Sequence, residues 1–170
     1  MISSSGVRAM FGWGLRQKVT DATIESLRPM LAMLQHHSGI PPHFWTDEFV
    51  LGFFGVLIGF HSRYASQDRL TQEDKGRVFI DVLTALSNMN GVELLRSYTS
   101  LAGNETPDFK LGGDRAMIIF GYLTGKLKNE QQYEEVVTAQ RIAGAADRSK
   151  IGAILIMTLF INEVEKRFSE

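Results

Sequence analysis

The sequence predicts an all-α protein, a compact bundle of six or seven helices, and three observations lead to that prediction. Apolar residues recur at the three-to-four-residue spacing of a helix through most of the 170 residues, without the alternation of a half-buried strand. Hydrophobic residues make up 44% of the chain, which is enough for a core at this length. The absence of cysteine excludes disulfide scaffolds and thiolate-ligated metal sites. We therefore expect residues 1–170 to form a single helical domain.

The first predicted helix carries an apolar stripe made of Ile24, Leu27, Leu31 and Leu34. Pro29 cannot donate a helical hydrogen bond, so the helix is expected to start or kink there. The run Gly39-Ile40-Pro41-Pro42 then ends it.

Residues 1–15 precede this helix and are predicted to be an N-terminal arm, either flexible or engaged in an interaction. Gly6, Gly12 and Gly14 disfavour a helix there. No acidic residue occurs before Asp21, a composition that also resembles an organellar targeting peptide. A plain arm is the favoured interpretation, and targeting or membrane-surface binding is the alternative.

The second predicted helix runs from about Thr46-Asp47-Glu48, which offers an N-cap and acidic residues for the helix dipole, to about Ala65. Its apolar run, Phe49 to Phe60, has 12 residues, whereas about 20 are needed to cross a bilayer. A helix that is apolar on all sides is buried on all sides. We therefore expect a central core helix and no transmembrane segment.

Gly52, Gly55 and Gly59 share one arc of this helix at about 100° per residue. Each glycine costs about 1 kcal/mol of helix propensity relative to alanine, so something is expected to approach the backbone closely. The favoured interpretation is a neighbouring helix that crosses at short distance, in which case Gly55→Leu should destabilise the fold by overpacking. The alternative is a flat ligand or a partner helix on this glycine face.

Capping and breaking signals predict five further helices, at about 72–90, 92–102, 114–128, 131–143 and 148–168. Gly103 is expected to be the left-handed C-cap of the fourth helix, and residues 103–113 to form the longest loop. The segment 112–115 would then open the fifth helix.

The last helix should be a second central element. Its tail is expected to protrude or to pair with another subunit through a stripe of Met157, Phe160, Ile161, Val164 and Phe168.

A weak internal repeat relates the third and fourth predicted helices to the fifth and sixth, at an offset of 40 to 41 residues. Asp74, Leu83 and Thr84 recur as Asp114, Leu123 and Thr124. Helical repeat proteins have periods in this range. The pattern is interpreted either as two related helical hairpins or as chance similarity between amphipathic hairpins.

Two groups of side chains are candidates for chemistry. His61, Arg63 and Tyr64 follow the apolar run directly and could form a small polar site at the rim of the bundle. The alternative is the half-buried boundary of a core helix. His36, His37 and His43 lie close together, yet they lack the spacing of known metal motifs. Surface or capping roles are therefore favoured, and no metal or cofactor is predicted.

The function prediction rests mostly on exclusions. The formal charge of −1, with basic residues mixed among acidic ones, argues against nucleic acid as a partner. No nucleophile elbow, phosphate-binding loop or dinucleotide fingerprint is present, so no catalytic residue is predicted. This favours a non-enzymatic, cytoplasmic protein-interaction or regulatory domain of unknown partner. Self-association would use the tail of the last helix or the arm, through Phe11 and Trp13.

The alternative is a small-molecule-binding helical bundle, or a weakly marked enzyme, with an apolar cavity beside the glycine face. The predicted ligand-binding residues would be Gly52, Gly55, Gly59, His61, Arg63 and Tyr64.

Overall fold

The computed structural model describes the backbone of residues 4–144 and 147–169, and side chains from residue 14 onward. Over these residues the protein is all-α, with seven helices and no strand, as the sequence predicts. The last helix consists of two α-helical parts joined by a π-helical segment, η2. The elements are α1 (Ser4–His37), α2 (Glu48–Ser66), α3 (Gln72–Ser87), α4 (Gly91–Gly103), α5 (Pro107–Thr124), α6 (Glu130–Ala143), α7 (Arg148–Ile156), η2 (Met157–Ile161) and α8 (Asn162–Phe168).

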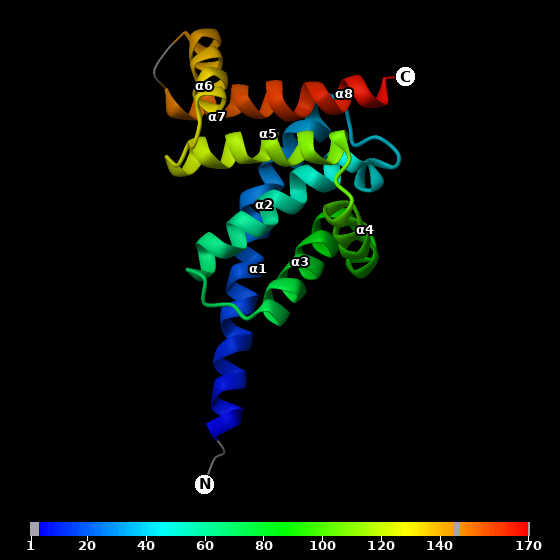
Figure 1. Ribbon diagram of the computed structural model, residues 1–170, viewed down its shortest axis with the longest axis vertical. Coiled ribbons are helices and arrows are strands. Elements are labelled where there is room, and N and C mark those ends of the chain that lie inside the picture. Colours follow the sequence, from blue (N-terminus) through cyan, green and yellow to red (C-terminus); the bar gives the residue numbers. More distant parts are fainter. Residues whose placement is uncertain (1–3, 145–146, 170) are drawn as a thin grey trace.

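Helix α2 is the centre of the fold. It packs most extensively against α5 and also contacts α1, α3 and α4. In Figure 1, α5 and the α7–α8 helix run side by side across one end of the molecule, while α1 runs lengthwise and projects beyond the other helices. The core is aromatic: Phe53 stacks on Phe160 with ring centroids 4.3 Å apart. Its largest fully buried rings are Phe44, Phe49, Phe53, Phe54 and Phe160.

The glycine face of α2 is filled by the protein itself at Gly52 and Gly55. A Cβ atom on Gly52 would overlap the backbone carbonyl of Phe109 in α5, and a Cβ atom on Gly112 would overlap the carbonyl oxygen of Phe49 in α2. A Cβ atom on Gly55 would overlap the ring of Tyr98 in α4. These positions show the close helix packing that was the favoured interpretation, and the space beside them is not open to a ligand.

Several helix ends follow their sequence signals. Each of six N-cap side chains accepts a hydrogen bond from a backbone N–H of its own first turn, which satisfies a donor that the helix leaves unpaired. These residues are Asp47, Thr71, Asn90, Thr106, Asn129 and Asp147. The third helix ends earlier than expected, at Ser87, because Asn88 adopts the left-handed conformation with φ of 56°.

The predicted loop 103–113 is wrong. Gly103 lies inside α4 and is not its left-handed cap, and α5 begins at Pro107 after a connection of only 104–106. Thr106 caps α5, and proline suits the first helical position because its missing N–H would have no partner there. The segment 112–115 therefore lies within α5, where its glycines allow the contact with α2.

The expected start of the first helix at Pro29 is also wrong. Helix α1 continues through Pro29, and its backbone is helical from Ser4 despite the glycines of the arm. Extending an existing helix fixes one residue for each hydrogen bond gained, so propagation from the packed part around Val19 offsets the low propensity of glycine. The side chains of Phe11 and Trp13 lie outside the described part of the chain.

The α7–α8 helix is continuous but contains the π-helical segment η2, where the N–H of Asn162 bonds to the carbonyl of Met157, five residues earlier. Phe160, Ile161 and Val164 are buried in the core of their own chain. The expectation that this stripe protrudes is therefore wrong for these three residues, and the ring of Phe160 packs against those of Phe49 and Phe53 in α2. Pairing with another subunit stays a prediction.

Helix boundaries follow the 40-to-41-residue offset only in part. Shifted by 41 residues, α4 falls on 132–144, close to the bounds of α6. Shifted by 40 residues, however, the start of α3 at Gln72 falls on Gly112, in the middle of α5. The second helices of the two hairpins correspond in position, and the first helices do not.

By length and hydropathy alone, α2 is the one described helix that could cross a membrane. Helices α3 and α4 meet the same criterion only as a pair bent by 114°. The relevant window of α2 is 61% buried inside the protein, and a central core helix meets this criterion as well.

Candidate functional site

A pocket of about 620 Å³ lies where the C-terminal parts of α2 and α5 meet the start of α6. We call it the α2–α5 pocket. Its apolar lining consists of Phe60, Tyr64, Met117 and Phe120. Its polar and charged lining includes Arg63, Asp68, Lys126, Lys128 and Gln132.

The pocket exists because the contact between α2 and α5 changes along their length. Near their N-termini the two backbones touch through glycines. Farther along, the facing residues are Phe60 and Phe120, whose rings stack with centroids 5.1 Å apart. Both helices then end in left-handed residues, Gln67 and Gly125, and the chain turns away. The pocket thus opens where the helices stop, and the rings of Phe60 and Phe120 form its aromatic floor.

Three cations surround this floor. Arg63 forms an ion pair of 2.8 Å with Asp68 at the end of α2. The ammonium group of Lys126 lies 5.8 Å from the ring centroid of Tyr64, and that of Lys128 lies 5.9 Å from the ring centroid of Phe60. These are distances of cation–π contacts. In the part of the chain that the structure describes, neither lysine forms an ion pair.

Gln132 fixes the connection that carries the two lysines. Its Oε1 atom accepts a 2.7 Å hydrogen bond from the backbone N–H of Lys128. The backbone N–H of Gln132 in turn donates to Oδ1 of Asn129. The residue is only 6% exposed, so the carboxamide is held firmly at the pocket wall. The turn between α5 and α6 is therefore tied to the first turn of α6.

His61 lies beneath the pocket and does not line it. Its ring contacts that of Phe120 edge-on, with centroids 5.1 Å apart. Burial lowers the pKa of His61 below its ordinary value of 6.5, because the charged imidazolium would lose water contacts. The imidazole is therefore neutral at pH 7 and supports the aromatic floor.

The structure brings together only two of the six predicted ligand-binding residues, Arg63 and Tyr64, in the pocket. Gly52 and Gly55 pack against other helices, and Gly59 has open space around it without lining the cavity.

Sequence reasoning missed Met117, Phe120, Lys126, Lys128 and Gln132 as pocket residues. The two lysines on either side of Leu127, just after the glycine that ends α5, were a usable signal for a cationic turn. The helix end that this turn would meet depends on tertiary packing.

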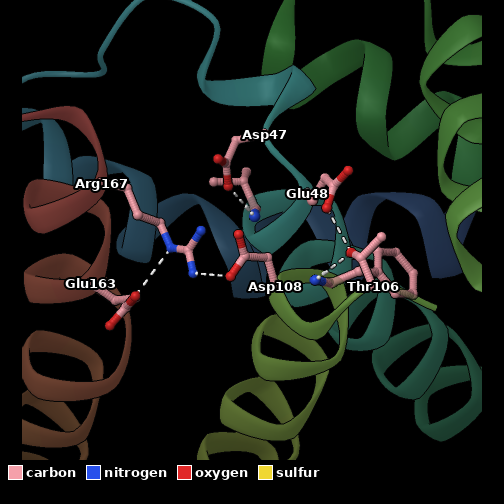
Figure 2. Close-up of polar contacts among 8 residues, drawn as sticks. Asp47, Glu48, Thr106, Asp108, Glu163 and Arg167 are labelled. Atoms are coloured by element: carbon pink, nitrogen blue, oxygen red, sulfur yellow. Dashed lines mark hydrogen bonds and ion pairs between the residues drawn. The ribbon is translucent and has the colours of Figure 1, made fainter. Parts of the chain in front are cut away.

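A second polar cluster lies at the opposite end of α2 (Figure 2). Arg167 of α8 donates to Asp108 of α5 at 2.8 Å and to Glu163 at 3.1 Å, and its guanidinium group lies 4.8 Å from the ring centroid of Phe49. The hydrogen bond and charge of Arg167 lower the pKa of Asp108. Arg167 thus has two carboxylate partners from two different helices.

Thr106 extends this cluster between the helix starts of α2 and α5. Its hydroxyl donates to Glu48 of α2 at 2.6 Å and accepts the N–H of Phe109 at 3.2 Å (Figure 2). The arrangement joins two helix N-termini and α8, which is a structural role.

The three clustered histidines do not form a metal centre in the described residues, where no group of three or more metal-ligating side chains is found. His37 instead lies 3.3 Å from Glu165 of α8. A smaller cavity of about 410 Å³ beside this pair is lined by Ser38, Pro41 and Phe168, among others.

Comparisons with protein-family models, with curated proteins and with solved structures give no match to this chain.

Proposed function

We propose that this protein is a non-enzymatic binding or regulatory protein that holds a small organic molecule in the α2–α5 pocket. The pocket itself carries the proposal. Its volume of about 620 Å³ lies within the range of roughly 300–1,000 Å³ that is usual for small-molecule sites. Such sites combine an apolar wall with a few polar groups, as the aromatic floor and charged rim do here.

Native mass spectrometry of the untagged protein, compared with its denatured mass, tests whether a ligand is retained. We expect extra mass that disappears on denaturation, or otherwise a compound that stabilises the empty protein in a thermal-shift screen. A ligand at 100 times its dissociation constant adds about 2.7 kcal/mol of stability, which raises Tm by several degrees.

Tyr64→Ala and Tyr133→Ala form a matched pair for locating the bound compound. Both tyrosines are exposed, by 63% and 54%, but only Tyr64 lines the pocket. We expect Tyr64→Ala to weaken binding about tenfold, since aromatic contacts at binding sites are worth roughly 1–2 kcal/mol. Tyr133→Ala should leave the affinity unchanged. Equal effects of the two variants would contradict a ligand site at the end of α2.

A second candidate function is contact with a protein partner through α6. Tyr133 and Val137 lie one turn apart on this helix and are 54% and 49% exposed. An exposed apolar pair of this kind suits a partner surface. Affinity capture with the wild type and with a Tyr133→Ala, Val137→Ala variant tests this candidate; a partner retained equally by both would contradict it.

A further inference from the structure

We infer that the α2–α5 pocket selects organic anions: compounds with a flat apolar body and a carboxylate, sulfonate or phosphate group. This inference rests on the proposed function and adds the chemical class of the ligand.

The charges around the pocket favour a negative ligand. Three cations, Arg63, Lys126 and Lys128, face the cavity together with one carboxylate, Asp68. That carboxylate is already shared, because it pairs with Arg63 at 2.8 Å and lies 3.9 Å from the ammonium of Lys75. The charged lining of the pocket therefore has an excess of two positive charges, which a bound anion would offset.

The two lysines can turn to an anion without breaking an ion pair. Each rests on an aromatic face, Lys126 on Tyr64 and Lys128 on Phe60. A cation–π contact at an exposed site is worth about 0.5–1 kcal/mol. A hydrogen bond between charged partners is worth about 1.5–3 kcal/mol. An anion should therefore draw the ammonium groups off the rings, which frees both ring faces to pack against the ligand body.

Neighbouring backbone groups do not cancel this preference. The C-terminal ends of α2 and α5 carry partial negative charge, but backbone N–H groups of Gln67 and Lys126 already bond to carbonyls of their last turns. Helix α6 begins beside the pocket with its positive end. In the described part of the chain, no residue accepts a hydrogen bond from Nε2 of Gln132, which leaves a donor at the pocket wall.

The test uses two fluorescent probes that differ by one charged group. 1-Anilinonaphthalene-8-sulfonate carries a sulfonate, and N-phenyl-1-naphthylamine has the same aromatic body without it. The variant carries Lys126→Met and Lys128→Met, and the control is Lys166→Met in α8, which is an exposed lysine at the opposite end of α2.

We expect the double variant to lose about tenfold in affinity for the sulfonate probe, because two partly solvated charge contacts contribute about that much together. Its affinity for the neutral probe should stay within about twofold of wild type, and Lys166→Met should change neither affinity. The wild-type affinity for the sulfonate probe should also fall as salt is raised.

The outcomes separate the two proposals. If the double variant binds the sulfonate probe as tightly as wild type, while Tyr64→Ala weakens both probes, the anion preference is wrong and the pocket stands. If neither probe binds, or if Tyr64→Ala affects neither, the small-molecule function is wrong and the anion inference is overturned with it. Circular dichroism and Tm confirm that each variant is folded, and Lys126→Gln with Lys128→Gln replaces any methionine variant that is not.

Discussion

The two ends of α2 are built from similar residue types but differ in how their charges are balanced. At the N-terminal end, Arg167 reaches from α8 to two carboxylate partners and an aromatic ring (Figure 2). At the C-terminal end, Lys126 and Lys128 also lie over aromatic rings, but they have no carboxylate partners among the described residues.

This difference indicates which end is structural and which is available for binding. Charges taken out of water must be paired, because an unpaired buried charge is strongly destabilising. Arg167 satisfies this requirement through Asp108 and Glu163. The two lysines lie at an open pocket in contact with water, so they can stay unpaired. The closed end, where Arg167 is paired, thus holds the fold, and the open, cationic end is the one at which we propose binding.

The largest effect is expected for a variant that disrupts the contact between α2 and α5 near the closed end. Gly112→Ala should destabilise the protein by about 3 kcal/mol or more, because the new methyl group would overlap the backbone of α2 and no side-chain rotation could relieve the overlap. Gly59→Ala, toward the open end, should instead stabilise by up to about 1 kcal/mol, since nothing lies within 4 Å of its Cβ position. Urea unfolding at pH 7 measures both changes, and a shift of the same sign in both would contradict the described packing.

The next effect concerns Arg167. Arg167→Met should destabilise by about 2 kcal/mol, because it leaves Glu163 and Asp108 without their cation. Since the folded protein lowers the pKa of Asp108, this part of the stability is present above the ordinary carboxyl pKa near 4 and is lost as the pH falls through the lowered value. The difference between wild type and variant in urea should therefore shrink between pH 7 and pH 3. A difference that grows on acidification would count against the ion pair.

The smallest effect lies at the open end and involves His61. Because burial lowers the pKa of His61, its contribution to stability is complete above the ordinary histidine pKa near 6.5 and decreases as the pH falls toward the lowered value. Wild-type Tm should therefore decline between pH 7 and pH 5 by more than that of His61→Gln. Parallel Tm curves for the two proteins would show that the imidazole is not desolvated.

Local signals in the sequence were sufficient for much of the fold. Asp47 and Thr71 mark helix starts because a cap acts on its own first turn. The apolar run 49–60 identifies α2 as central because no face of it could meet water. Glycine spacing predicts a close crossing, although the partner, the backbone around Phe109, is distant in sequence.

The remaining features depend on tertiary contacts or on competing signals. The glycines at 112–113 resemble a helix start, and only the packing against α2 explains them inside α5. Two of the residues around the pocket, Arg63 and Tyr64, could be predicted from the sequence because they follow the apolar run. Lys126 and Lys128 could not be predicted in the same way, because they lie in a turn whose position depends on where α5 ends against α2. The sequence predicts His61 in the same polar site, but its ring lies edge-on against Phe120 and does not line the pocket.

The π-helical segment Met157–Ile161 determines the direction in which Arg167 points. A π bulge amounts to one residue inserted into an α-helix, and one residue corresponds to a rotation of about 100° about the helix axis. The part of the helix before it faces α6 and α5, while the part after it carries Arg167 toward Asp108. If the same residues formed a regular α-helix, the second half would be rotated by about 100°, with the guanidinium group turned away from α5. The ion pairs of Arg167 at the closed end of α2 thus depend on a phase shift made at least six residues earlier in the chain.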